Sequence, residues 1–244
     1  MFCFKYRNRH LEFNSLLLLL FFSISIFGQD DLSQVDKFIS TAKETKKFDL
    51  VCLDNFDGET IYKYFRNVSH LQNLSFPEKI PSSPIFEKET VELPEIYTKD
   101  GKSLLIETYI NNPAREKISI EPQFSKYVEG GYPFRVSLWV HSDYYRGNLT
   151  IQFKNSVFGI QKINMGSLDF SGWKRMEKEF PFLEKKIRDK TPQKEKFYFS
   201  SINIEFNKNQ APAQIIIYLD RLSVLLEKFT EYPGSEVKDS WGLK

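Results

Sequence analysis

The chain has 244 residues, of which 34 are basic and 32 acidic, so its formal net charge is only +2. A charge this small gives no long-range attraction to nucleic acid or to an anionic lipid surface, which argues against a nucleic-acid-binding protein. Beyond residue 28 the chain has only Cys52, His70 and His141 as cysteines and histidines, and it has no Cys-x-x-Cys pair, so a structural zinc site of the usual spacing is also excluded.

An apolar run near the start of the chain predicts an export signal. The run Leu16–Phe27 follows Lys5, Arg7 and Arg9 and is closed by Gly28. About a dozen apolar residues are too few to span a bilayer as a helix, which takes roughly 20. Residues 1–28 are therefore predicted to be a signal peptide that is cleaved near Gly28, which leaves a protein without a transmembrane segment outside the cytoplasm.

The next segment, residues 29–47, is predicted to be an amphipathic N-terminal helix. Leu32, Val35, Ile39 and Ala42 recur every three or four residues between polar side chains. Such an apolar stripe can pack on the domain that follows or dock on another protein, and the sequence favours neither.

Residues 48–228 are predicted to be one mainly β domain, a sandwich of two antiparallel sheets. Apolar residues alternate with polar ones in one short segment after another, as expected of strands with one buried face. Residues 229–244 are predicted to be a C-terminal tail. The apolar alternation is clearest at Leu104, Ile106, Ile110, Phe134, Val136, Leu138, Leu149, Ile151, Phe153, Ile202, Ile204, Phe206, Ile215, Ile217 and Leu219.

The stretch between Asn67 and Pro94 carries several prolines, at Pro77, Pro81 and Pro84 as well as Pro94. Each proline lacks a backbone donor. An extended loop with edge pieces is predicted here.

Two acidic residues are candidate ligands of a structural calcium ion. Asp54 ends the first predicted strand and Asp220 ends a late one, and acids from such strands can meet in a sandwich. The alternative is a salt link from Asp220 to a neighbouring base and turn chemistry at Asp57 and Gly58. No other cofactor is expected, and no nucleophile with a matching base is indicated, so the protein is predicted not to be an enzyme.

Aromatic residues form a predicted partner interface. Trp139 alternates away from the inward side chains of its strand, and Tyr144 and Tyr145 follow at the next turn. Trp173 and Trp241 are added as further exposed aromatics, since such residues are typical of protein contacts. On this interpretation Trp139→Ala or Tyr145→Ala leaves folding intact and weakens association; the alternative is that a helix or loop covers Trp139.

Several short motifs resemble one family. They are Leu53–Asp57 (LDNFD), Ser171–Trp173 (SGW), Tyr218–Leu222 (YLDRL) and the tail Tyr232–Ser235 (YPGS) that closes on Trp241. Together they are similar to the FlaA family of flagellar filament outer layer, or sheath, proteins of spirochaetes. The resemblance implies an exported, non-enzymatic protein that coats the flagellin core of a periplasmic flagellum, contacts neighbouring coat subunits and supports filament shape and motility. It also implies that the mainly β domain is a jelly-roll-like antiparallel β-sandwich, because the family domain is similar to galactose-binding-like jelly rolls.

An exported carbohydrate-binding module is the alternative function. The same sandwich can present aromatic side chains to sugar rings, with Trp139, Trp173 and Trp241 as the platforms. That function predicts saturable binding of a soluble glycan, whereas a sheath protein is expected to be recovered with flagellin after cell fractionation.

Overall fold

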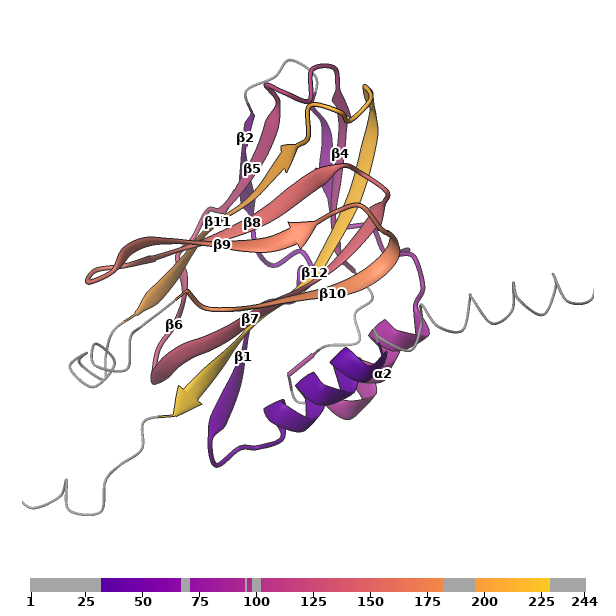
Figure 1. Ribbon diagram of the computed structural model, residues 1–244. Coiled ribbons are helices and arrows are strands. Elements are labelled where there is room, and N and C mark those ends of the chain that lie inside the picture. The colour runs from indigo at the N-terminus through magenta and orange to yellow at the C-terminus, as the bar shows by residue number, and fades with distance from the viewer. Residues whose placement is uncertain (1–31, 67–70, 95, 98–101, 182–195, 229–244) are drawn as a thin grey trace, which may run out of the picture.

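The computed structural model describes residues 32–66, 71–94, 96–97, 102–181 and 196–228 (Figure 1). These residues form twelve strands, β1 to β12, and two short helices. The strands make two sheets in which the neighbouring strands pair antiparallel. The prediction of a mainly β, antiparallel sandwich is confirmed.

Each sheet has six strands. The first sheet has the order β10 (Ser171–Glu179), β7 (Gly131–Asp143), β12 (Ala213–Lys228), β4 (Leu104–Ile110) and β3 (Leu71–Ser75), and β1 (Phe48–Asp54) pairs with the later half of β12. The second sheet has the order β2 (Tyr62–Arg66), β5 (Lys117–Pro122), β11 (Phe197–Phe206), β8 (Gly147–Asn155) and β9 (Gly159–Ser167), and β6 (Lys126–Val128) pairs with β11.

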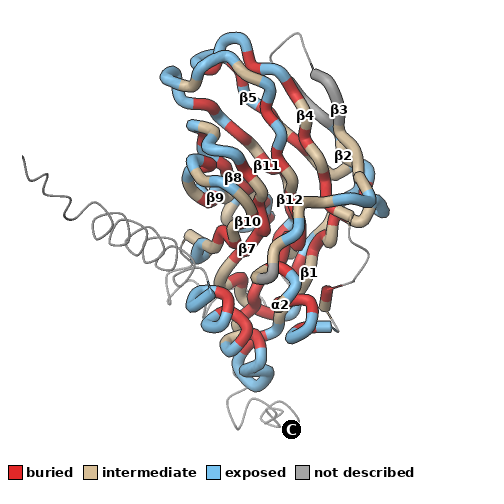
Figure 2. Tube along the Cα trace, turned by 90° about the vertical axis from the view of Figure 1, so that its right-hand side faces the viewer, coloured by how far each residue is buried: buried red, intermediate tan, exposed pale blue. Residues whose placement is uncertain are grey.

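The main core lies between the two sheets. Alternate residues of each strand point inward, so β12 contributes Ile215, Ile217 and Leu219, and β8 contributes Leu149 and Ile151, all without solvent exposure. Figure 2 shows the resulting alternation of buried and exposed positions along the strands. Removal of this apolar surface from water is the main favourable term that holds the sheets face to face.

Two helices cover the outer face of the first sheet (Figure 1). The first spans residues 32–42 and confirms the predicted N-terminal helix; Val35, Ile39 and Ala42 are buried. The apolar stripe of this helix therefore packs within the chain. The second helix, α2 (Pro84–Glu92), runs beside the first, and the pairs Lys88–Asp36 and Lys43–Glu92 link the two.

The helix α2 corrects the prediction of an extended proline-bearing loop. Pro84 stands in the first turn of α2, where the backbone N–H has no partner inside the helix, so the missing donor costs nothing. Ser83 precedes it as the N-cap residue with an extended backbone, and Leu93 closes the helix.

A second core lies between the helices and the first sheet, separate from the main core. Its buried members come from both helices, from the segment after α2 and from strands β7 and β10. They are Val35, Phe38, Ile39, Ala42, Phe86, Leu93, Tyr97, Trp139 and Trp173.

Several predicted segments lie outside the described residues. These are the signal peptide 1–28 and the C-terminal tail 229–244 with Trp241, so the predicted domain bounds remain predictions. None of the helices among the described residues has the length and apolar character that a membrane crossing requires.

Candidate functional site

The two tryptophans predicted as partner contacts lie inside the protein instead. Trp139 is 1 % exposed and Trp173 is 9 % exposed. Phe86 of α2 packs edge-on against Trp139, with ring centroids 5.4 Å apart, and stacks on Trp173 at 5.0 Å. Trp173 also donates a hydrogen bond from Nε1 to the carbonyl oxygen of Pro81. The prediction that Trp139 and Trp173 meet a partner protein is thus wrong, because the helices cover this face of the sheet.

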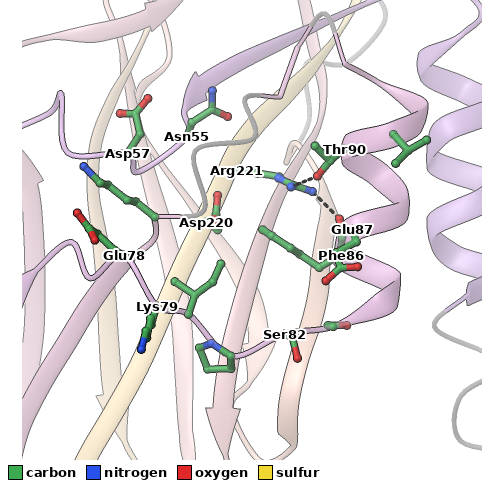
Figure 3. A pocket seen from close by; sticks show the side chains of 15 residues that line it. Asn55, Asp57, Glu78, Lys79, Ser82, Phe86, Glu87, Thr90, Asp220 and Arg221 are labelled. Carbon is green, nitrogen blue, oxygen red and sulfur yellow. Dashed lines mark hydrogen bonds between the residues drawn. The ribbon is translucent and has the colours of Figure 1, made fainter.

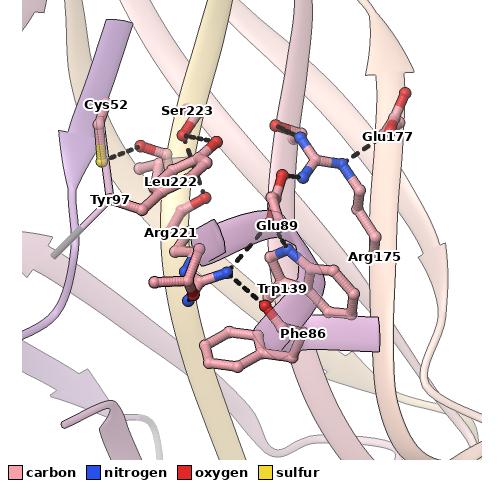
Figure 4. A network of polar contacts seen from close by, with 12 residues as sticks. Cys52, Phe86, Glu89, Tyr97, Trp139, Arg175, Glu177, Arg221, Leu222 and Ser223 are labelled. Carbon is pink, nitrogen blue, oxygen red and sulfur yellow. Dashed lines mark hydrogen bonds and ion pairs between the residues drawn. The ribbon is translucent and has the colours of Figure 1, made fainter. Parts of the chain in front are cut away.

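A buried ion cluster joins α2 to the first sheet (Figure 4). Glu89 of α2, which has no solvent exposure, accepts hydrogen bonds from Arg175 of β10 and from the indole Nε1 of Trp139. Its second cation is Arg221 of β12, with Nη1 at 3.4 Å. Glu177 completes the charge balance by pairing with Arg175 Nε at 2.7 Å.

Both arginines of this cluster are also placed over aromatic rings. The guanidinium of Arg175 lies 3.3 Å from the ring centre of Phe38, and that of Arg221 lies 3.7 Å from the ring centre of Phe86. Burial lowers the pKa of Arg175 to about 10 and also lowers the pKa of Arg221. Both are cations at neutral pH, because the guanidinium group keeps its proton in proteins. Each of the two arginines therefore has an ionic and an aromatic partner, and the cluster attaches α2 to the first sheet.

A bulge in β12 explains why Arg221 reaches α2. Before the bulge Ile217 and Leu219 face the main core, and after it Leu222 and Val224 do, so one extra residue is accommodated between them. The register of β12 against β7 shifts between Asp220 and Ser223, and Arg221 has a positive φ of 50°. A bulge of this kind re-aims a side chain, and here it places two successive charged residues, 220 and 221, on the helix side of the sheet.

A cavity of about 690 Å³ opens beside this bulge (Figure 3). Figure 3 shows Asn55 and Asp57 on one side, Glu87 and Thr90 of α2 on the other, and Asp220 between them. We call this space the α2 cavity. It is lined by Asn55, Asp57, Glu78, Lys79, Ile80, Pro81, Ser82, Ser83, Phe86, Glu87, Thr90, Val91, Lys102, Asp220 and Arg221.

Asp220, predicted as a calcium ligand, is a buried carboxyl in the wall of the α2 cavity. Its Oδ2 accepts a hydrogen bond of 2.5 Å from Ser103 Oγ. Burial raises the pKa of Asp220 to about 7, although the Ser103 hydroxyl and the Arg221 guanidinium act in the opposite direction and Asp54 adds to the rise. The carboxyl is therefore poised between its two protonation states at neutral pH.

This raised pKa predicts a pH dependence of stability. The folded protein keeps the Asp220 proton up to pH values near 7, whereas the unfolded chain loses it near the ordinary value of 3.8, so stability falls as pH rises through that window. The Asp220→Asn variant is expected to lack this part of the decline when urea unfolding is compared at about pH 5 and about pH 8. Asp143→Asn, which changes an exposed carboxyl on β7, serves as control. If the free energy of unfolding fell equally between the two pH values for the wild type and for Asp220→Asn, Asp220 would not be the group responsible.

Asp54, the other predicted calcium ligand, already has partners for both oxygens. Oδ1 accepts a hydrogen bond from the Phe56 amide, and Oδ2 accepts one from the Tyr62 hydroxyl at 2.6 Å and pairs with Lys126 Nζ at 2.8 Å. Among the described residues no group of three or more histidine, cysteine, aspartate or glutamate side chains is placed to hold a metal. Calcium binding stays a prediction.

The turn between β7 and β8 holds the remaining predicted contact residues. Tyr144 is 66 % exposed, has a positive φ of 54° and donates its amide to the carbonyl oxygen of Phe170. Tyr145 is half-buried against the main core, and its hydroxyl accepts a hydrogen bond of 3.1 Å from the amide of Ile216. The next amide, of residue 146, donates to the side chain of Gln210. The Tyr144 ring is therefore held outward by a turn that is fixed on several sides.

The ion cluster and the α2 cavity were not foreseen as sites. The motif Tyr218–Leu222 contains the one available signal, since Asp220 and Arg221 interrupt a strand that is otherwise strongly apolar. Charged residues in such a strand need buried partners. Glu89 carried no comparable signal, because it lies among other charged residues in a segment predicted to be a loop.

Comparison with solved structures finds weak likenesses. TmCBM61, solved in complex with β-1,4-galactotriose, is 10 % identical, with 71 % of this chain and 92 % of that chain covered and a TM-score of 0.38. The family 11 carbohydrate-binding module of the cellulase Lic26A-Cel5E of Clostridium thermocellum is 11 % identical, with coverages of 75 % and 98 % and a TM-score of 0.40. At these identities and TM-scores the likenesses carry no argument about what this chain binds. No curated protein matches the sequence.

Comparison with protein families finds a match in the later part of the chain. Residues 131–231 match the FlaA family, described as flagellar filament outer layer protein Flaa. The matched segment includes strands β7 to β12, and with them Trp139, Tyr144, Trp173 and the bulge at Asp220 and Arg221. The FlaA resemblance predicted from the sequence is confirmed to this extent: residues 131–231 are similar to the family of flagellar filament outer layer proteins.

Proposed function

We propose that this chain is a non-catalytic sheath subunit of a periplasmic flagellar filament, which binds the flagellin core and neighbouring coat subunits and thereby supports filament shape and motility. The observation that carries the proposal is the match of residues 131–231 to the flagellar filament outer layer family. That segment supplies central strands to both sheets, so the family relation concerns the body of the sandwich.

The turn at Tyr144 is the surface that we assign to a filament contact. A large aromatic side chain that is exposed yet held by a rigid turn loses little conformational entropy when a partner covers it. The chain is also close to neutral, with a formal net charge of +2, so copies packed side by side repel one another only weakly.

The proposal is tested on filaments purified from the organism that makes the chain. The chain is expected to be recovered with flagellin in the filament fraction, and filaments from cells that lack it are expected to be thinner and altered in curvature by electron microscopy. Recovery of the chain only in the soluble periplasmic fraction, with unchanged filaments, would overturn the proposal.

A variant of the exposed tyrosine tests the assigned contact. Tyr144→Ala is expected to change the free energy of unfolding by less than about 0.5 kcal/mol, since the ring is exposed. If the Tyr144 ring lies in the interface, its removal is expected to weaken the affinity for filaments, measured by co-sedimentation, by about tenfold. The control is Val157→Ala, an exposed apolar residue in the β8–β9 turn; an equal effect of both variants, or none for Tyr144→Ala, would contradict the contact.

A further inference from the structure

Asp220 is a buried carboxyl group that forms no ion pair with the residues that the structure describes. It is 4 % exposed, and it accepts a hydrogen bond from the Ser103 hydroxyl, while the charge and the backbone N–H of Arg221 also favour its ionised form. Within the described part of the chain, no lysine, arginine or histidine nitrogen lies within the 4.0 Å that defines an ion pair with this carboxylate. The neighbouring Arg221 is turned toward α2, where Phe86, Glu89 and Thr90 bind it. A buried carboxylate without a counterion is costly, so a cation delivered to this point would gain a strong partner.

The α2 cavity gives such a cation a path to Asp220. Its volume of about 690 Å³ falls within the range typical of ligand sites, about 300 to 1,000 Å³. The apolar residues of its lining are Ile80, Pro81, Phe86 and Val91. An aliphatic stem can lie against such residues while a charged end group reaches the carboxylate, which is how lysine side chains commonly cover apolar surface.

The charges around the cavity favour a cation. Arg221 is matched by Glu89 in the ion cluster, so it does not count toward the free charge of the lining. Four carboxyl groups then face two ammonium groups in the lining residues. The acids are Asp57, Glu78, Glu87 and Asp220, and the bases are Lys79 and Lys102.

The hydrogen bonding of Asp220 distinguishes between the two kinds of cationic side chain. An arginine binds a carboxylate best through two parallel hydrogen bonds, one to each oxygen. Here Ser103 already occupies Oδ2 of Asp220. The ammonium of a lysine is a compact point charge that needs only one free oxygen.

We propose that the α2 cavity binds a lysine side chain presented by another protein of the filament, with its stem against Phe86 and Pro81 and its ammonium paired with Asp220. The identity of the partner as a filament protein rests on the proposed function. The chemistry of the site, an alkylammonium group on an aliphatic stem, does not.

The site is tested on the isolated protein with Nα-acetyl-lysine methylamide as probe. The carboxyl carbon of Asp220 is followed by NMR while the probe is added at millimolar concentrations. A saturable shift of that signal is expected, together with a fall in the pKa of Asp220, because a bound cation stabilises the carboxylate against the opposing effects of burial and of Asp54. The norleucine analogue, which has the stem without the charge, is expected to leave the signal in place.

Two variants and two further probes make the test decisive. Asp220→Asn is expected to abolish the binding of the lysine probe, and Asp143→Asn, at an exposed position on β7, to retain it. Absence of a shift in the wild type, or equal shifts with the norleucine analogue or with glucose, would overturn the proposal. Binding of free 1,5-diaminopentane more than about tenfold tighter than that of the blocked lysine would also overturn it, because the site would then serve a small amine.

The filament partner is tested separately from the cavity. If the isolated protein binds the probe but the chain is absent from filaments, the cavity chemistry stands and the filament assignment fails. If the chain is present in filaments, Asp220→Asn is expected to be recovered with them less than Glu44→Gln, which changes an exposed carboxyl outside the turn at Tyr144. Equal recovery of these two variants would overturn the cavity as a filament contact.

Discussion

The Glu89→Ala variant is expected to lose about 3 to 5 kcal/mol of the free energy of unfolding, as is typical when one partner of a buried ion pair is removed. Without this carboxylate, Arg175 and Arg221 remain buried with like charges facing each other and only Glu177 to compensate them. A loss of this size is a large share of the 5 to 15 kcal/mol that a typical domain has. The measurement is equilibrium urea unfolding followed by far-UV circular dichroism.

The matched control lies on the same helix. Glu87→Ala removes an exposed carboxylate two residues earlier and is expected to change stability by less than about 1 kcal/mol. A third variant tests the charge argument itself: Glu89→Met combined with Arg175→Met and Arg221→Met is expected to be more stable than Glu89→Ala alone, because no uncompensated charge is left. Equal stability of Glu89→Ala and the wild type would mean that the cluster does not attach α2.

The strands could be predicted because their signal is local. Apolar residues alternate along β4, β7, β8, β11 and, on either side of its bulge, β12, and these are the residues that meet between the two sheets. The same holds for the helix at residues 32–42, where Val35, Ile39 and Ala42 repeat at helical spacing. The motif at Tyr218–Leu222 likewise lies in the segment that matches the FlaA family, although the bulge inside it was not foreseen.

The covering of the outer face could not be predicted, because it depends on contacts between residues far apart in the sequence. The helix α2 is held by Phe86, which packs on Trp139 and Trp173, and by Glu89, which meets Arg175 and Arg221; all of these partners follow much later in the sequence. On β7 the alternation gives Trp139 polar neighbours on its own face, Ser137 and His141, and so indicates an exposed face. Ser137 instead accepts a hydrogen bond from Arg175 beneath the helices.

This covered face reverses the expectation for Trp139. The Trp139→Ala variant, predicted from the sequence to fold normally, is now expected to lose about 3 to 5 kcal/mol of the free energy of unfolding, the usual cost of removing a buried aromatic side chain. The indole is 1 % exposed, packs edge-on against Phe86 and donates its N–H to Glu89. The variant therefore leaves a cavity beside Phe86 and removes one hydrogen-bond donor from the buried Glu89 carboxylate.

The cost of Trp139→Ala decides which account of this face is correct. Urea unfolding should be followed by far-UV circular dichroism, and the fluorescence of Trp173 should shift to longer wavelength if the helices loosen, because Trp173 stacks on the same Phe86. Tyr144→Ala, at an exposed aromatic residue of the same sheet, is the matched control and should stay within about 0.5 kcal/mol of the wild type. A loss below about 1 kcal/mol for Trp139→Ala would be typical of a surface position. That result would mean that α2 and the N-terminal helix do not cover this face in solution. Trp139 would then be accessible to a partner protein.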